Sequence, residues 1–231
     1  MRRRLPHAGG AEAVMNYYPI YIDISGKLVT VVGGGEVALR KVQDLLAAGA
    51  VIRVISPEFH DGFSGLISSR DGRIEALHRP YIPGDLKGSR LVFSATNDSA
   101  VNREVFREAE EAGIFINAVD DPPNCSFIIP SSFSRGDLSV CVSTGGASPA
   151  MSAKIRRLLE EHVPDDIETI LEAMKAARTL LKEDSAFSTI SSPERGALLK
   201  RITAEDALLS SLKKNYENHT LKEFLRDLAA Q

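Results

Sequence analysis

The 231-residue chain has few cysteines, no excess of charge of either sign and no long apolar run. Its two cysteines, Cys125 and Cys141, have neither metal-ligand spacing nor the density of a disulfide scaffold. We interpret them as ordinary small apolar residues in a reducing compartment. The formal charge of -3 offers no surplus of Lys and Arg to a nucleic-acid backbone, which argues against a nucleic-acid partner.

No segment approaches the roughly 18 apolar residues of a membrane span. The basic opening MRRRLPHAGGAEAV lacks the apolar core of a signal peptide. We therefore expect a cytoplasmic protein with no membrane partner, and a disordered extension over residues 1–14 with Met15 as a candidate true start. The 5 histidines have no ligand spacing with one another, so no metal site is predicted.

Strand-like and helix-like segments alternate over the first half of the chain. β-branched runs predict strands at 27–32 and 51–56, and a helix-period pattern between them predicts a helix at 36–48. Such alternation is typical of a parallel sheet with helices on both faces. Further strands are predicted within 73–81, at 90–96 and at 114–120. A further helix is predicted within 97–113, starting with an Asn-Asp-Ser cap.

The pattern changes after Asp120. Two β runs joined by SRGD indicate a hairpin rather than a crossover. A second glycine-rich turn then leads into a helix that ends before Pro164, and the remaining chain is almost wholly helical. The sequence therefore predicts an α/β fold: a Rossmann-type parallel sheet, a β-plus-helix connector and an all-helical C-terminal region. We expect domains at 15–124, 125–163 and 164–231.

The stretch VVGGGEVALRK places three glycines between a predicted strand and a predicted helix. Gly33, Gly35 and Ala38 fit the pattern G-x-G-x-x-G/A. In this pattern the first glycine allows a tight turn, the second admits a pyrophosphate, and the small third residue lets the helix pack on the strand. The helix N-terminus would supply free N–H groups and a positive dipole end to the anion. A dinucleotide site is predicted; a purely structural glycine turn is the alternative.

The acidic residue that usually ends the second strand of this motif is missing, because Ser56 lies there. Glu58 can still take the ribose hydroxyls, and no Arg or Lys follows at once to hold a 2′-phosphate, so NAD is favoured over NADP. Thr96 and Asn97 follow the fourth strand at the carboxyl edge, where open sheets bind ligands. Equally, Asn97 or Asp98 can serve only as a helix cap.

Asp120 and Asp121 end the fifth strand at the same edge. A carboxylate there can exchange protons with a substrate held over a nicotinamide. The alternative is a plain loop pair, with Pro122 and Pro123 turning the chain. The basic residues of SAKIRRLLEE would ordinarily form a solvated helix face. They become candidates for substrate binding only if the substrate is a polyanion.

Four segments together resemble the precorrin-2 dehydrogenase family, the siroheme-synthase enzymes: YPIYIDISGKLVTVVGGGEVALRKVQDLLAAGA, FSATNDSAVN, INAVDDPPNCSFIIPS and VSTGGASPAMSAKIR. The resemblance extends from about Tyr18 to Val163, in the family's order, and no methyltransferase domain follows, as in free-standing members. It implies NAD-dependent oxidation of precorrin-2 to sirohydrochlorin and an intertwined homodimer with much of its interface in the connector. Some members also insert Fe(II) to give siroheme.

The resemblance also implies site residues. The family's essential aspartate falls on Asp120, and Thr144 replaces a family serine before the two glycines of the connector while keeping a hydroxyl. A tetrapyrrole ringed by carboxylates would need cations at its rim. The implied cofactor contacts are Gly33, Gly34, Gly35, Glu36, Val37, Pro57 and Glu58. Thr96 and Asn97 are added to them because they follow the fourth predicted strand. The candidate rim residues are Arg135, Lys154, Arg156 and Arg157.

Two functions remain open from the residues. The first is an NAD-dependent tetrapyrrole dehydrogenase, with iron insertion as an added activity to be tested. The second is a non-catalytic NAD-sensing module, which would need no proton acceptor at the sheet edge. For either, we expect a homodimer, because the β runs of the connector carry more apolar surface than a lone hairpin can bury.

Overall fold

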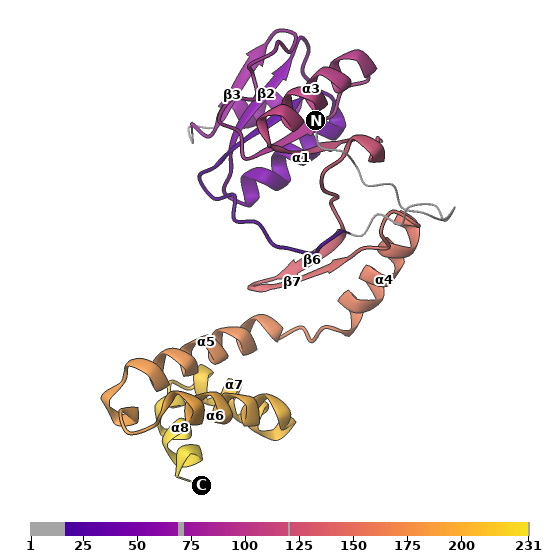
Figure 1. Ribbon diagram of the computed structural model, residues 1–231. Coiled ribbons are helices and arrows are strands. Elements are labelled where there is room, and N and C mark those ends of the chain that lie inside the picture. Colours follow the sequence, from indigo (N-terminus) through magenta and orange to yellow (C-terminus); the bar gives the residue numbers. More distant parts are fainter. Residues whose placement is uncertain (1–16, 69–71, 120, 231) are drawn as a thin grey trace. The chain divides into compact units, whose positions relative to one another are not determined.

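The computed structural model describes residues 17–68, 72–119 and 121–230, and the structural statements that follow refer to these residues. The chain divides into two compact units between Ile129 and Pro130 (Figure 1). The predicted extension over residues 1–14 and the candidate start at Met15 lie outside the described residues.

The first unit contains a five-stranded parallel sheet in the order β3-β2-β1-β4-β5. Strand β1 (Leu28–Val32) lies at the centre and pairs with β2 (Val51–Ser56) on one side and β4 (Leu91–Ser94) on the other. Strands β3 (Ile74–His78) and β5 (Phe115–Ala118) form the edges. The strand order reverses between β1 and β4, which is the position where open α/β sheets bind ligands.

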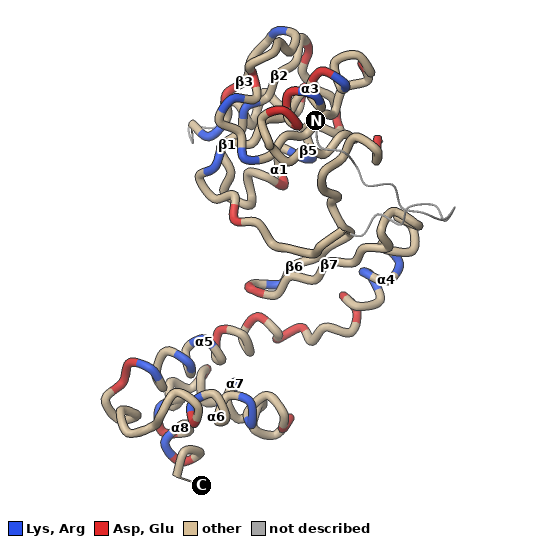
Figure 2. The backbone as a smooth tube through the Cα atoms, in the orientation of Figure 1, with Lys and Arg blue, Asp and Glu red and all other residues tan. Residues whose placement is uncertain are grey.

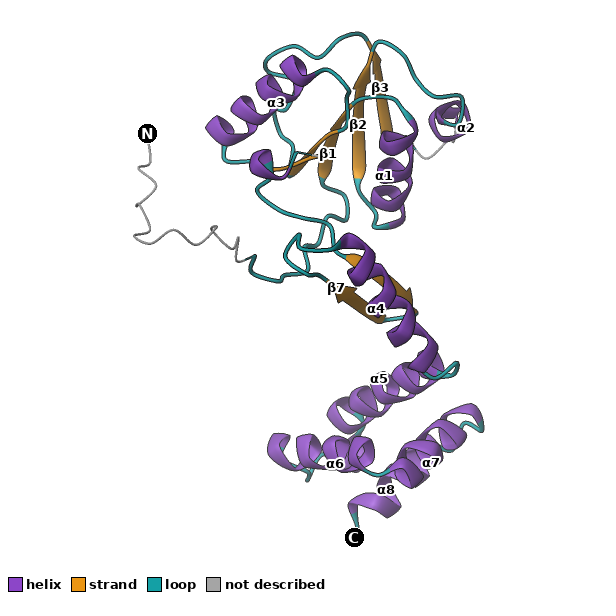
Figure 3. Cartoon of the chain, turned by 90° about the vertical axis from the view of Figure 1, so that its right-hand side faces the viewer, coloured by secondary structure: helices purple, strands orange, loops and turns teal. Residues whose placement is uncertain are grey.

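Helices cover both faces of this sheet (Figure 3). On one face α1 (Glu36–Ala47) and α2 (Phe63–Ser68) pack over a core that includes Val31. On the other face α3 (Ser99–Ala112) packs over a core that includes Val32. Adjacent side chains of β1 thus pack into the cores on opposite faces of the sheet, as the two-residue period of a strand requires. The predicted Rossmann-type sheet is confirmed.

Helix α2 was not predicted, because six residues that include a glycine are too few to show a helical period. The start of α3 agrees with one of the two predicted caps. The Asp98 carboxylate accepts hydrogen bonds from the N–H groups of Ala100 (2.8 Å) and Val101 (3.2 Å). Asp98 is therefore the helix cap, and Asn97 precedes it.

The second unit begins with the predicted hairpin, in which β6 (Ser131–Arg135) and β7 (Leu138–Val142) pair antiparallel. Helix α4 (Pro149–His162) packs against both strands. Short 3₁₀ turns lie at Pro122–Asn124 in the first unit and Ser185–Phe187 in the second. The helical remainder consists of α5 (Ile167–Glu183), α6 (Ser192–Ala204), α7 (Asp206–Glu217) and α8 (Leu221–Ala229).

The helices α5 to α8 have a core of their own. Phe187, Leu212 and Leu225 are among its fully buried side chains. Both acidic and basic residues occur along these helices (Figure 2). Among the described residues, no helix combines the length and the apolar character that crossing a membrane would take. The predicted all-helical C-terminal region is confirmed.

An ion pair closes the loop between β3 and β4. The Arg79 guanidinium donates two hydrogen bonds of 2.7 Å to the Asp85 carboxylate, which also accepts from the Ile82 N–H at 2.9 Å. The hydrogen bonds from Arg79 hold the pKa of Asp85 below its usual value. Since the folded pKa is lowered, the charged carboxylate stabilises the fold at pH values above the unfolded pKa of about 3.9.

We therefore expect Asp85→Asn to lower the free energy of unfolding at neutral pH. The difference from the unaltered protein should begin to shrink as pH falls below about 4, where the unfolded carboxyl becomes protonated, and should be lost at the lower pH where the folded carboxyl is protonated too. Urea unfolding at a series of pH values measures this. A difference that stays constant from pH 7 to pH 3 would show that the charge of Asp85 contributes nothing.

Candidate cofactor and substrate site

The carboxyl ends of three strands meet at the glycine turn after β1. The Gly33 N–H donates to the carbonyl of Ile55 in β2 at 2.9 Å, and the His60 N–H donates to the Gly34 carbonyl at 2.8 Å. The Ala95 N–H, directly after β4, donates to the carbonyl of the last β1 residue at 2.7 Å. These backbone bonds hold the loops after β2 and β4 against the turn.

The three glycines of the turn have different surroundings. A Cβ on Gly33, whose φ is +119°, would lie 2.3 Å from the Ala95 carbonyl oxygen. A Cβ on Gly34 would lie 2.2 Å from the Glu58 carbonyl oxygen. A Cβ on Gly35 would meet no atom within 4 Å. Protein contacts therefore require glycine at the first two positions, whereas Gly35 borders open space at the start of α1.

The N-terminus of α1 faces this space without a side-chain cap. Gly35 is the N-cap residue and accepts the first helical hydrogen bond, from the Leu39 N–H at 3.0 Å. Ala38 is fully buried, which confirms the predicted close packing of helix on strand. The earlier N–H groups of the helix, including those of Glu36 and Val37, have no helical partner and point toward the N-terminal side. An anion fits there.

The loop after β2 places an acidic residue beside the turn. The buried Ser56 hydroxyl donates to the Glu58 carbonyl at 2.6 Å, which shapes the loop from within. Pro57 and Glu58 are exposed. The predicted ribose contact at Glu58 is thus accessible, and its backbone already touches the position of Gly34.

The loop after β4 places Thr96 and Asn97 at the same edge. The Thr96 hydroxyl accepts a hydrogen bond from the Asp98 N–H at 3.0 Å, so its own hydrogen remains available to donate. Thr96 is half-buried and Asn97 is exposed. Both residues predicted to contact a cofactor therefore lie on the carboxyl edge with the glycine turn.

Asp120, the predicted catalytic residue, lies outside the described residues. The chain that follows it returns along the outer edge of β5. There the Cys125 thiol accepts from the Ala118 N–H (3.2 Å) and donates to the Ala118 carbonyl (3.1 Å), while the Ser126 hydroxyl accepts from the Ile116 N–H (2.7 Å). Side chains thus pair backbone groups that an edge strand would leave open. Burial raises the pKa of the Cys125 thiol, which keeps it a donor.

The interpretation of Cys125 as a plain apolar residue was therefore wrong. Cys125 acts through its polar thiol, Cys141 is exposed on β7, and neither cysteine is in a disulfide. Nothing in the spacing of the sequence reveals the role of Cys125, because its partners depend on which strand forms the sheet edge.

The glycine-rich turn of the connector is built by hydroxyl groups. Thr144 accepts from the Ser148 N–H at 3.0 Å, and its Oγ1 lies 3.1 Å from the Oγ of buried Ser152. Gly145 and Gly146 have φ values of +63° and +93°, and a Cβ on either would meet nothing within 4 Å. Thr144 therefore shapes the turn before α4, while its proposed contact with substrate stays a prediction.

The four predicted rim cations differ in what they already bind. Arg135 donates to three carbonyls at the end of α4, at 2.7, 3.1 and 3.4 Å, and pairs with Asp165 at 3.5 Å. Arg156 pairs with Glu160 one turn later. Lys154 and Arg157 are exposed on α4, which carries a basic stretch in Figure 2. These two have the more available charges, and all four belong to the second unit.

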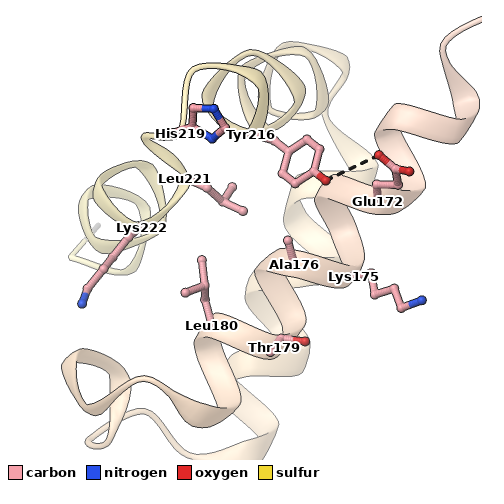
Figure 4. Close-up of a pocket in the computed structure, with 9 residues that line it drawn as sticks. All are labelled: Glu172, Lys175, Ala176, Thr179, Leu180, Tyr216, His219, Leu221 and Lys222. Carbon is pink, nitrogen blue, oxygen red and sulfur yellow. Dashed lines mark hydrogen bonds between the residues drawn. The ribbon is translucent and has the colours of Figure 1, made fainter.

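A groove of about 680 Å³ lies among α5, α7 and α8 (Figure 4). At one end the Tyr216 hydroxyl donates to Glu172 at 3.4 Å, and at the other the Lys222 ammonium pairs with Asp184 at 2.7 Å. Leu180 lies between them. No residue predicted from the sequence lines this groove, and several of its polar groups already have partners, so we do not include it in the candidate site.

Two family models match the chain. A model for NAD(P)-binding domains matches residues 20–131, and one for the central part of sirohaem biosynthesis proteins matches residues 135–162. A solved structure titled SirC, a precorrin-2 dehydrogenase, superposes with a TM-score of 0.72 at 26% identity, covering 93% of this chain and 100% of that one.

Curated relatives carry the name siroheme synthase. The chain is 36% identical to that of Actinobacillus pleuropneumoniae over 168 residues and 40% identical to that of Pseudomonas paraeruginosa over 169. Siroheme synthase 2 of Aeromonas salmonicida is 37% identical over 200 residues. These alignments cover 73%, 73% and 87% of this chain but only 34%, 36% and 40% of the relatives. The chain thus spans well under half the length of the relatives that it matches.

The contrast between Gly34 and Gly35 gives a test of the anion site. Gly35→Asp should keep the fold, because the position is open and Asp is a favourable N-cap residue. It should abolish dinucleotide binding, since the carboxylate takes the free N–H groups and repels the pyrophosphate. Gly34→Ala should instead lower the free energy of unfolding by about 1–3 kcal/mol through the clash with Glu58.

Calorimetric titration with NAD and thermal unfolding of both variants measure these two effects. Unchanged NAD affinity in Gly35→Asp would remove the site from the glycine turn.

Proposed function

The chain belongs to the siroheme synthase and precorrin-2 dehydrogenase family, and we propose that it oxidises precorrin-2 to sirohydrochlorin with NAD as hydride acceptor. The observation that carries this proposal is the open space at Gly35, in front of an uncapped helix N-terminus at the switch point of the sheet. The two neighbouring glycines are explained by protein contacts alone, whereas Gly35 is not.

The residues around the turn fit a dinucleotide. The N–H groups at the start of α1 would bind the pyrophosphate, and the exposed Glu58 would accept hydrogen bonds from the ribose hydroxyls. A 2′-phosphate at that position would meet the negative charge of Glu58, so NAD is preferred to NADP. We expect an affinity ratio of at least tenfold in favour of NAD.

The oxidation removes a hydride and a proton from precorrin-2 and extends its conjugation. The nicotinamide of bound NAD supplies the hydride acceptor. The protein must supply the proton acceptor, and we propose Asp120, which follows β5 in the sequence, for that role. Lys154 and Arg157, whose charges are the more available, would bind carboxylates at the substrate rim.

Removal of Asp120 tests the chemical step. Asp120→Ala should retain NAD binding and lower the rate of precorrin-2 oxidation by at least about 10²-fold, the usual effect of a lost acid–base group. Incubation of precorrin-2 and NAD with the protein, followed by the absorption spectrum of sirohydrochlorin, measures the rate. A variant that works at the unaltered rate would end the assignment of Asp120.

The same assay addresses the alternatives. A folded protein that binds NAD and leaves verified precorrin-2 unchanged would be an NAD-sensing module. Insertion of Fe(II) into supplied sirohydrochlorin needs no nicotinamide, so Gly35→Asp should leave any such activity intact. We propose dehydrogenation as the principal activity. If the protein inserts Fe(II) no faster than the spontaneous reaction, dehydrogenation is the only one of these two activities that it catalyses.

We also propose a homodimer formed through the connector. Four large apolar side chains of α4 recur at helical spacing and are exposed, although the helix packs on the hairpin with its other side. Burying such a stripe against its counterpart in a second chain around a two-fold axis would remove it from water. The stripe consists of Met151 (47% exposed), Ile155 (36%), Leu158 (46%) and Leu159 (43%).

Light scattering tests this assembly. The unaltered chain of 25.1 kDa should give about twice that mass at micromolar concentration. Leu158→Lys combined with Leu159→Lys should give the monomer mass, because two charges would have to be buried. Ile82→Lys is the control, since Ile82 is as exposed (52%) but belongs to the first unit. A monomer mass for the unaltered protein would contradict the proposal.

A further inference from the structure

The side chain of Asn102 holds the loop after β4 from the first turn of α3. Its amide donates to the Thr96 carbonyl at 3.0 Å, and its Oδ1 accepts from the buried Ser94 hydroxyl at 2.6 Å. Its backbone N–H donates to the Asp98 carbonyl at 3.0 Å. Asn102 thus joins the end of β4, the middle of the loop and the start of α3.

This arrangement determines the direction of one peptide group. In a trans peptide the carbonyl and the following N–H point in opposite directions. Because Asn102 binds the Thr96 carbonyl, the Asn97 N–H points away from α3. The hydroxyl of Thr96 accepts from Asp98 and keeps its hydrogen for another acceptor. The carbonyls of Thr96 and Asp98 thus accept hydrogen bonds within the chain, whereas the Asn97 N–H and the Thr96 hydroxyl can donate to a ligand.

The same loop has little freedom to move toward the glycine turn. The Ala95 carbonyl oxygen would lie only 2.3 Å from a Cβ on Gly33, so the two backbones are already in close contact. The Ala95 N–H is bound to the end of β1 at 2.7 Å. The start of the loop is thus fixed by the sheet, and Asn102 fixes its continuation through Thr96.

We propose that Asn102 is a positioning residue for the dinucleotide: its carboxamide orients the peptide between Thr96 and Asn97 so that the loop donates hydrogen bonds to the bound cofactor. This rests on the proposed function, because it presumes that NAD binds at the glycine turn. Asn102 itself touches no cofactor in this assignment, and its effect reaches the site only through the loop.

The chain offers a matched control. Asn215 in α7 makes the same pair of bonds far from the glycine turn in sequence: its amide donates to the Ser211 carbonyl at 2.8 Å, and its Oδ1 accepts from the Thr220 hydroxyl at 2.7 Å. In either residue, replacement by Asp keeps the shape and the acceptor but removes the donor. If the substitution only lowers the stability of the protein, Asn102→Asp and Asn215→Asp should therefore have similar effects.

The experiment compares NAD affinity by titration calorimetry and the unfolding temperature in both variants of the full chain. Asn102→Asp should weaken NAD binding at least tenfold, whereas Asn215→Asp should leave it within twofold of the unaltered protein. With precorrin-2, Asn102→Asp should raise the KM for NAD while kcat at saturating NAD stays within threefold. If Asn102→Asp does not fold, Ser94→Ala is tested instead, because it removes the hydroxyl that binds Asn102 Oδ1. Ser94→Ala should weaken NAD binding at least threefold and leave the unfolding temperature unchanged.

NAD affinity of folded Asn102→Asp within twofold of the unaltered protein would overturn the positioning role while leaving the proposed function intact. An equal loss of affinity in Asn215→Asp would also overturn it, since the effect would then be one of general stability. An unaltered protein that fails to bind NAD would overturn the proposed function and this inference together.

Discussion

Close backbone approach at the glycine turn is the constraint on which the candidate site depends. Gly33 and Gly34 lie so near the carbonyl groups of Ala95 and Glu58 that neither can carry a Cβ. The turn and the loops after β2 and β4 therefore fit together only in this arrangement. The space beside Gly35 takes its position from the same contacts, so the proposed anion site is a consequence of how three strands end.

Polar side chains complete the hydrogen bonds that the sheet leaves open around this edge. Asn102 binds the loop after β4, and Cys125 and Ser126 pair backbone groups along the outer edge of β5. Buried N–H and carbonyl groups need partners, and where a parallel sheet ends no further strand supplies them. In the sequence, these three hydrogen-bonding residues lie close to the candidate site residues Thr96, Asn97 and Asp120.

The second unit divides its polar and apolar surfaces differently. Arg135 and Thr144 direct their polar groups inward, to the end of α4 and to the turn before it. By contrast, α4 exposes apolar side chains as well as Lys154 and Arg157. A helix that presents both kinds of surface is suited to an assembly in which one part is covered by another chain and the other part meets an anionic ligand.

The sheet, the glycine turn and the helical tail can be predicted from sequence patterns, because each follows from the spacing of residues close together in the chain. Apolar periods predict strands and helices, and Gly33, Gly35 and Ala38 lie within one turn and one helix. The fold was needed to show that Asp98 rather than Asn97 caps α3, that Arg135 is already bound, and what Cys125 and Asn102 contact. Most of these roles depend on partners that are distant in the sequence or set by the strand order. Arg135 binds carbonyls more than twenty residues away, and Cys125 binds backbone groups of β5 that are open only because β5 is an edge strand.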